Sequence, residues 1–187
     1  MGKAVLKMFS QLGEKASLLY PDLEPGSVKA FVFGGAAVHL YTNARGSHDV
    51  DAEIVGAGSL APEDLVVTYE DEEGEDQILV WDSNYNPTLA PLHEDYMDDA
   101  ICITDDQSET LWVYLVAAVD LAVSKLGRFA AHDREDIKEL ARKGLINTEL
   151  LRERAEEAFV YYVGNVETAR GSLNIAVSDL HLIDDEE

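Results

Sequence analysis

Two short motifs in the segment FVFGGAAVHLYTNARGSHDVDAEI, residues 31–54, have the residue types and spacing to do chemistry. Gly34 and Gly35 follow an apolar run, and a turn there would present backbone N–H groups and the positive end of a helix dipole, which can hold a phosphate. Asp49 and Asp51 then lie two positions apart. On a strand this spacing places both carboxylates on one face, where they could bind Mg²⁺ together with triphosphate oxygens.

The elements that must position these motifs are predicted from hydrophobic periodicity. Apolar residues recur with helical spacing over 2–20, and 28–33 is a short buried-strand run that ends at the glycine pair. A short helix follows, and 48–55 alternates like a half-buried strand. Residues 65–69 and 77–81 are typical of a hairpin with Gly74 in its turn. Residues 83–99 predict an irregular loop and 100–104 a further short strand, with Cys102 in the core.

From residue 111 onward the pattern predicts helices over 111–127, 133–143 and 147–170, separated at Gly127 and Gly144. The expected fold class is α+β: a small mixed β-sheet backed by helices, with a helical C-terminal part. The expected division is an α/β core over 1–105, a helical part over 106–170 that closes a cleft, and an acidic tail over 171–187.

The charge distribution excludes several classes of partner. The chain of 187 residues has 14 basic and 37 acidic residues, and no Lys or Arg occurs between residues 46 and 124. Such a surface repels nucleic acid and anionic membranes, because binding to phosphates begins with their neutralisation by Lys and Arg. Most of these acids are expected to form a solvated surface. No apolar run resembles a membrane span or a signal peptide, so we expect a cytoplasmic protein.

The combination Phe33-Gly34-Gly35 followed by Asp49-Val50-Asp51-Ala52 resembles the pattern of the nucleotidyltransferase superfamily, which has the polymerase-beta-like fold. The resemblance implies that Asp49 and Asp51 hold Mg²⁺ or Mn²⁺ as the cofactor. It also implies a third carboxylate, on a later strand, that helps to activate the attacking hydroxyl. Asp82 is the first choice for this catalytic role because it ends a strand expected beside the acid pair, and Asp76 is the alternative.

A narrower resemblance, to bacterial nucleotidyltransferase-like proteins related to the AbiEii and MenT toxins, rests on the motifs Arg45-Gly46-Ser47, Lys125-Leu126-Gly127-Arg128 and Asp133-Arg134-Glu135-Asp136-Ile137. It implies a toxin–antitoxin or defence setting and a cognate partner protein. The implied nucleotide-binding residues are Gly34, Gly35, Arg45, Ser47, Lys125 and Arg128. Two alternatives stay open for the later motifs: Lys125 and Arg128 could complement a helix end, and Asp133 could cap a helix.

The leading hypothesis is a metal-dependent nucleotidyltransferase that moves an NMP from an NTP to a hydroxyl acceptor on a protein, a small molecule or an RNA. A protein or a small molecule suits the acidic surface better than a long nucleic acid. Ala36 and Ala37 stand where active members commonly carry Ser or Thr, which motivates the alternative of a catalytically silent fold that acts as a binding or antitoxin-like module. A third possibility is an acidic protein that occupies a basic surface of a partner.

Overall fold

The computed structural model describes the whole chain except residues 45–46, 57–64, 71–73 and 185–187. It divides into two compact units. Unit 1 comprises Met1–Tyr85 and Ala100–Leu115, and unit 2 comprises Asn86–Asp99 and Val116–Glu187. No helix within the described residues is long and apolar enough to cross a membrane.

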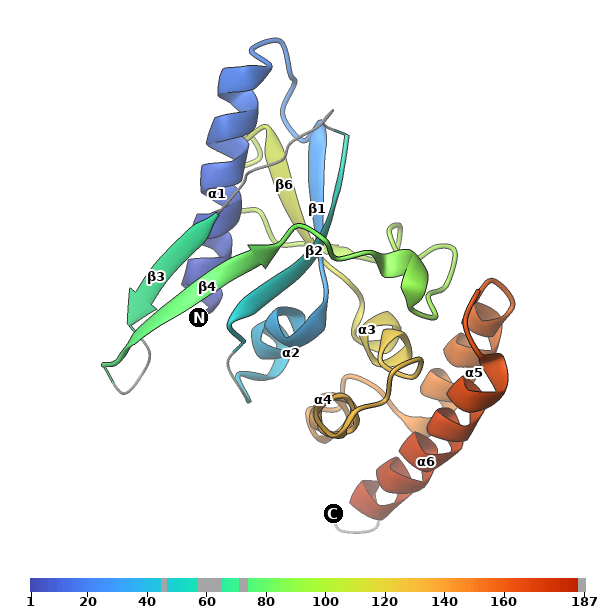
Figure 1. The fold of residues 1–187 in the computed structure, drawn as a ribbon. Helices are drawn as coiled ribbons and strands as arrows, with labels where there is room; N and C mark the ends of the chain where they lie inside the picture. Colours follow the sequence, from blue (N-terminus) through green and yellow to red (C-terminus); the bar gives the residue numbers. More distant parts are fainter. Residues whose placement is uncertain (45–46, 57–64, 71–73, 185–187) are drawn as a thin grey trace. The chain divides into compact units, whose positions relative to one another are not determined.

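Unit 1 is built on a six-stranded mixed sheet (Figure 1). In chain order its strands are β1 Val28–Val32, β2 Asp49–Val55, β3 Val66–Glu70, β4 Asp76–Asp82, β5 Ile101–Cys102 and β6 Leu111–Leu115. Their order across the sheet is β3-β4-β2-β1-β6-β5. The pairs β1–β6 and β2–β4 are parallel, whereas β1–β2, β3–β4 and β5–β6 are antiparallel. The predicted α+β class and the predicted hairpin are therefore confirmed.

Two helices, α1 Gly2–Leu19 and α2 Gly34–Thr42, pack against this sheet. The amphipathic α1 buries one stripe of side chains and contacts β3, β4 and β6, while α2 contacts β2. Along β2, Val50 and Ala52 are buried, and the residues between them belong to the opposite face because side chains alternate along a strand. The covered face thus fixes which residues of β2 are left for the open face.

The helix predicted over 111–127 is wrong. Leu111–Leu115 is β6, which pairs in parallel with β1 near the middle of the sheet, and only Ala118–Ser124 is helical, as α3. A short continuous apolar run fits a buried strand and a buried helix equally well, and the partner that decides between them lies about 80 residues earlier in the chain. Cys102, expected in the core, is exposed on the short strand β5.

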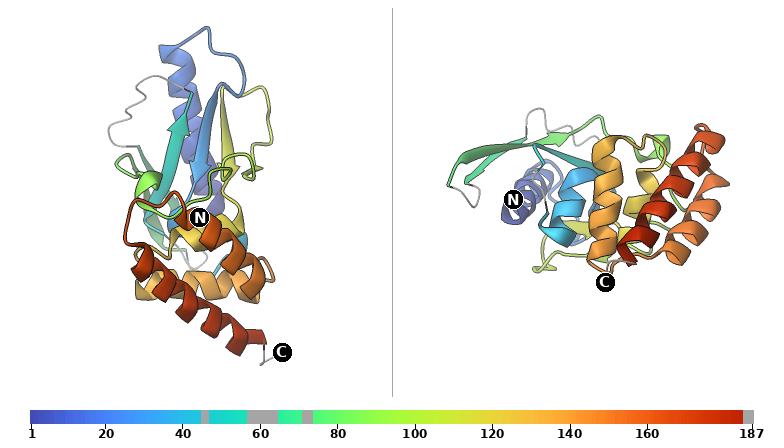
Figure 2. Two further views of the ribbon diagram at one scale, coloured as in Figure 1. Left: turned by 90° about the vertical axis from the view of Figure 1, so that its right-hand side faces the viewer. Right: turned by 90° about the horizontal axis from the view of Figure 1, so that it is seen from below.

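Unit 2 consists of helices and the short 3-10 helix η1 Pro87–Leu89. Besides α3, its helices are α4 Ala131–Arg142, α5 Thr148–Phe159 and α6 Val166–Asp184. Contacts join α3 to α4 and α5, and α6 to α4 and α5 (Figure 2). The helix expected over 147–170 is two helices, and α6 continues to Asp184, so most of the segment 171–187 belongs to a helix and is not a separate tail.

Candidate functional site

The glycine pair lies at the junction of β1 and α2, as the sequence predicted. Phe33 has an extended backbone, and Gly34 begins α2 with a φ of 62°, in the left-handed region that favours glycine. The backbone N–H of Phe33 donates to the carbonyl oxygen of Asp51 at 2.8 Å, which extends the β1–β2 pairing by one residue. The start of α2 is thereby held beside the acidic segment of β2.

Gly34 and the carboxylate of Asp51 are in direct contact. A Cβ built on Gly34 would lie 1.9 Å from Oδ2 and 2.8 Å from Cγ of Asp51. No side chain can be accommodated there unless the carboxylate moves. Two independent reasons therefore favour glycine at position 34: the positive φ of its backbone and the space that the Asp51 carboxylate occupies.

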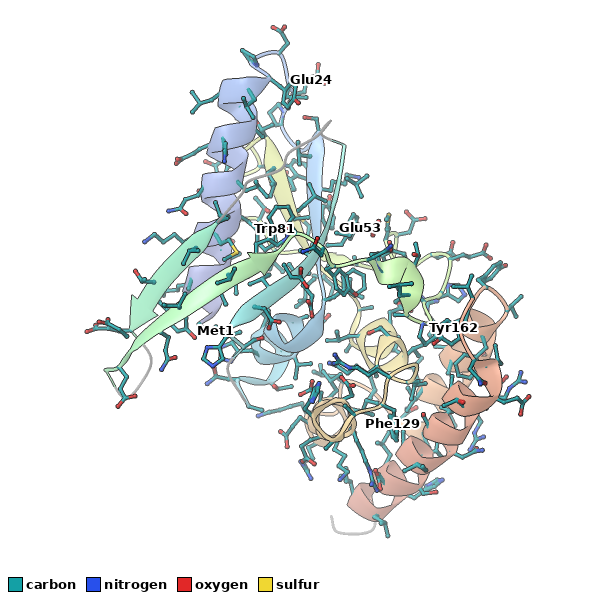
Figure 3. All side chains as sticks on the ribbon, in the orientation of Figure 1. Met1, Glu24, Glu53, Trp81, Phe129 and Tyr162 are labelled. Carbon is teal, nitrogen blue, oxygen red and sulfur yellow. The ribbon has the colours of Figure 1, made fainter. Side chains whose placement is uncertain are left out.

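Asp82 lies beside Asp51 across the parallel pairing of β2 and β4. The register places Asp51 opposite Asp82 and Asp49 opposite Val80, so Asp49, Asp51 and Asp82 share one face of the sheet. Figure 3 shows the side chains on these two strands, with Glu53 labelled on β2 and Trp81 on β4. Asp76, the competing choice, begins β4 and pairs with Glu70, roughly 20 Å of strand from Asp82.

Local hydrogen bonds orient the carboxylates of Asp49 and Asp82. The Ser47 hydroxyl donates to Oδ1 of Asp49 at 2.7 Å, and the backbone N–H of Asn84 donates to Oδ1 of Asp82 at 2.9 Å, in a turn that ends β4. Asp49 is exposed and the other two are half-buried. Arg45, the remaining nucleotide-binding residue predicted in this segment, lies outside the described residues.

The carboxylates of Asp49 and Asp51 are the type of ligand that binds Mg²⁺, an ion that commonly takes few ligands from the protein. Within the described part of the chain, no group of three or more His, Cys, Asp and Glu side chains is arranged to hold a metal ion. Mg²⁺ is commonly bound through one or two carboxylates together with substrate phosphates and water. Asp49 and Asp51 are two carboxylates of the kind that could hold such an ion together with phosphate oxygens.

Residues 7–180 match the family described as "Nucleotidyltransferase of unknown function (DUF6036)". The chain belongs to this family. The match extends over residues of both units. It includes the glycine pair, the three carboxylates, helices α3 to α5 and α6 as far as residue 180. No curated protein and no solved structure matches the chain. The general nucleotidyltransferase resemblance is thus confirmed, and the narrower relation to AbiEii and MenT toxins stays a prediction.

In this nucleotidyltransferase-family chain, two residues predicted to bind the nucleotide lie in unit 2. Lys125 and Arg128 both form ion pairs with carboxylates of that unit. The side chain of Lys125 is only 5% exposed, and its Nζ lies 2.8 Å from Oδ2 of Asp136 and 3.7 Å from Oδ1 of Asp133. Arg128 donates from Nε and Nη2 to the two oxygens of Asp133, at 2.8 and 2.7 Å. Their predicted role in nucleotide binding stays a prediction.

Asp133 has the helix-start role that the sequence left open, although it is the third residue of α4 and not its cap. It accepts a hydrogen bond at 2.9 Å from the backbone N–H of Ala130, which precedes the helix. Burial raises the pKa of Asp133, but hydrogen bonds from Arg128 and Ala130 and the nearby cationic charges outweigh burial, so its pKa lies below its ordinary value. The network therefore favours the ionised form of Asp133.

A second buried ion pair in unit 2 was missed by the sequence analysis. Asp120, fully buried on α3, accepts from Nε and Nη2 of Arg154 on α5, both at 2.7 Å. Asp99 accepts from the same guanidinium at 2.5 Å, and these bonds raise the pKa of Arg154. The signal available in the sequence was a single acid inside the apolar run 115–123, because a buried carboxylate needs a partner.

Proposed function

We propose that the chain transfers a nucleoside monophosphate from an NTP to a hydroxyl group, and that the reaction takes place on the open face of the unit 1 sheet. One observation carries the proposal: Asp51 lies between the glycine turn, which it contacts directly, and Asp82, which faces it across β2 and β4. The glycine turn and the carboxylates of Asp49, Asp51 and Asp82 thus lie close together in a chain of a nucleotidyltransferase family, which supports the proposal.

Each group has a role that follows from its chemistry. Asp49 and Asp51 would hold Mg²⁺ or Mn²⁺, which when bound stabilises negative charge on the phosphates. The backbone N–H groups of Gly34 and Gly35 at the start of α2 would bind phosphate oxygens. The Ser47 hydroxyl orients Asp49, and it could also reach a phosphate. Arg45, as an always-charged residue, would add a cationic contact.

The proposed transfer is an in-line displacement at the α-phosphorus of the NTP. The acceptor oxygen forms a bond to the α-phosphorus, and the bond from this phosphorus to the bridging oxygen of the β-phosphate breaks. The electron pair leaves with pyrophosphate, and Asp82 takes the proton of the attacking hydroxyl. The N–H of Asn84 donates to Oδ1 of Asp82, so the proton is proposed to go to the other oxygen, Oδ2.

The acceptor is proposed to be a protein or a small molecule, and not a long nucleic acid, because the chain carries no Lys or Arg between residues 46 and 124. A toxin–antitoxin or defence setting with a cognate partner protein is part of the same proposal. It is motivated by the resemblance of the motifs around residues 45–47 and 125–137.

The test is thermal unfolding with each of the four NTPs, with and without Mg²⁺, for the wild type, Asp49→Asn/Asp51→Asn and Asp82→Asn. A ligand at about 100 times its dissociation constant adds roughly 2.7 kcal/mol to stability. We expect a metal-dependent shift that the double variant loses and that Asp82→Asn keeps, since Asp82 is assigned to proton transfer. Asp76→Asn, on the same strand at its distant end, is the matched control and keeps the shift.

A folded protein that shows no shift with any NTP would contradict the proposal and favour the silent-fold alternative. One observation already supports that alternative: Ala36 and Ala37 are fully buried in the first turn of α2, so no hydroxyl is offered to a phosphate there. The silent-fold alternative predicts that Asp51→Asn changes neither nucleotide binding nor phenotype.

A further inference from the structure

The β3–β4 hairpin exposes an apolar surface on the same side of the sheet as the three carboxylates. Val66, Ile78 and Val80 are 47%, 53% and 40% exposed, whereas Val67 and Leu79 on the opposite side are buried. Val66 faces Val80 and Thr68 faces Ile78 directly across the two strands. These four residues therefore form one continuous patch, which we call the hairpin face.

Acidic residues bound the hairpin face at both ends. Glu70 and Asp76, both exposed, face each other at the end near the turn. Asp49 faces Val80 at the other end. Like charges directly opposite each other on paired strands are destabilising, so a cation placed between Glu70 and Asp76 would relieve their repulsion. Since Asp49 is assigned to the metal ion, Glu70 and Asp76 are the acids left for a partner, and this acidic pair beside an apolar centre is complementary to a segment that combines apolar and cationic side chains.

We propose that the hairpin face binds a polypeptide segment of the acceptor protein that is rich in Lys or Arg and in apolar side chains. Binding there would present a hydroxyl group of that segment to Asp82. This inference rests on the proposed function, whose acceptor it specifies. A nucleic acid lacks the cations that the acids require, and its phosphates would be repelled. A second copy of this chain would bring the same acids against one another.

The position of the hairpin face relative to the reaction groups supports a docking role. Val80 and Asp82 are two residues apart on β4 and point to the same face, about 7 Å from each other along the strand. Val80 is also the residue opposite Asp49. A segment lying over Val80 therefore has its next side chains beside the carboxylates that would bind the metal and take the proton.

The experiment selects ligands for the full chain from a display library of random 12-residue peptides, with a random single-stranded RNA pool selected in parallel. We expect enriched peptides that carry Lys or Arg, apolar residues and at least one Ser, Thr or Tyr. Their binding is then measured by fluorescence anisotropy. We expect it to weaken at least tenfold in Val66→Ser/Ile78→Ser and in Glu70→Lys/Asp76→Lys.

Matched controls come from unit 2. Val163→Ser removes a valine that is 80% exposed, and Glu153→Lys reverses an exposed charge, so both are expected to bind the peptides like the wild type. All variants are first compared with the wild type by far-UV circular dichroism and melting temperature. Because the substituted residues of the hairpin face are exposed, these variants are expected to fold like the wild type, and lost binding would then report on the surface itself.

Asp51→Asn separates this inference from the proposed function. We expect this variant to lose the NTP-dependent thermal shift and to keep peptide binding. If the NTP shift is absent in the wild type but peptides bind through the hairpin face, the transfer proposal fails and the docking surface stands. No enrichment of peptides, equal binding to the hairpin variants, or RNA ligands that depend on the hairpin face would each overturn the inference.

Discussion

Replacement of Gly34 by alanine tests whether the glycine turn and Asp51 are coupled as the structure indicates. The substitution adds a Cβ at a residue with φ of 62°, 1.9 Å from Oδ2 of Asp51. The carboxylate must move by about 1.5 Å to restore an ordinary contact of 3.4 Å. The variant therefore strains the backbone and also displaces the carboxylate that is proposed to hold the metal.

The two costs can be separated by a matched variant in the same unit. Gly74 has a φ of 80°, and no described atom lies within 4 Å of a Cβ built there, so Gly74→Ala carries the backbone cost alone. That cost is about 1–2 kcal/mol, offset in part by about 0.4–1 kcal/mol from the stiffer unfolded chain. We expect Gly34→Ala to cost about 2 kcal/mol more than Gly74→Ala, because Asp51 is forced from its rotamer and its packing.

The assay is thermal unfolding followed by tryptophan fluorescence, which reports on unit 1 because both tryptophans, Trp81 and Trp112, lie there. For a unit of about 100 residues, an excess of 2 kcal/mol corresponds to a further fall of roughly 8–16 °C in the melting temperature. Since the carboxylate of Asp51 is displaced, Gly34→Ala is also expected to lose the metal-dependent NTP shift, which Gly74→Ala keeps.

A double-mutant cycle decides whether Asp51 causes the excess. In the Asp51→Ala background Oδ2 and Cγ are gone, and the nearest remaining atom of residue 51, its Cβ, lies 3.1 Å from the new methyl group. There Gly34→Ala is expected to cost about as much as Gly74→Ala. The reasoning is refuted if Gly34→Ala and Gly74→Ala are equally destabilising in the wild-type background, or if the excess persists without the carboxylate.

Two further predictions concern the ion pairs of unit 2. Lys125→Met removes the 2.8 Å partner of the buried Asp136 carboxylate, so urea unfolding followed by far-UV circular dichroism should show a loss of about 3–5 kcal/mol in the free energy of unfolding. Lys138→Met breaks a 3.4 Å pair with the half-exposed Glu135 and should cost under about 1 kcal/mol; equal losses for the two variants would contradict the burial argument. The lowered pKa of Asp133 means that the folded state favours its ionised form, so its stabilisation is complete above the ordinary carboxyl pKa of about 4 and is lost as the pH falls through the lower folded value. Acid titration of unfolding should therefore show a smaller loss of stability for Asp133→Asn than for the wild type, and identical pH profiles would show that Asp133 does not make this contribution.

The sequence by itself determined the features that depend on neighbouring residues. Alternation along 48–55 showed which residues of β2 share a face, and a glycine pair after an apolar run indicated the turn into α2. The helical spacing over 2–20 predicted α1 to within a residue at its end. These features follow from side-chain periodicity and backbone preferences, which are properties of short segments.

Only the tertiary structure decided the features that depend on pairing between distant segments. Leu111–Leu115 is a strand because β1 is available beside it, and Asp82, unlike Asp76, faces Asp51 because of the register of β4 on β2. Lys125 is neutralised by Asp136 across a turn that brings α3 and α4 together. Local sequence determines which face of its own strand or helix a side chain occupies. Which residue lies opposite it depends on how distant elements pack together, and segments far apart in the chain share no periodic pattern that would reveal this.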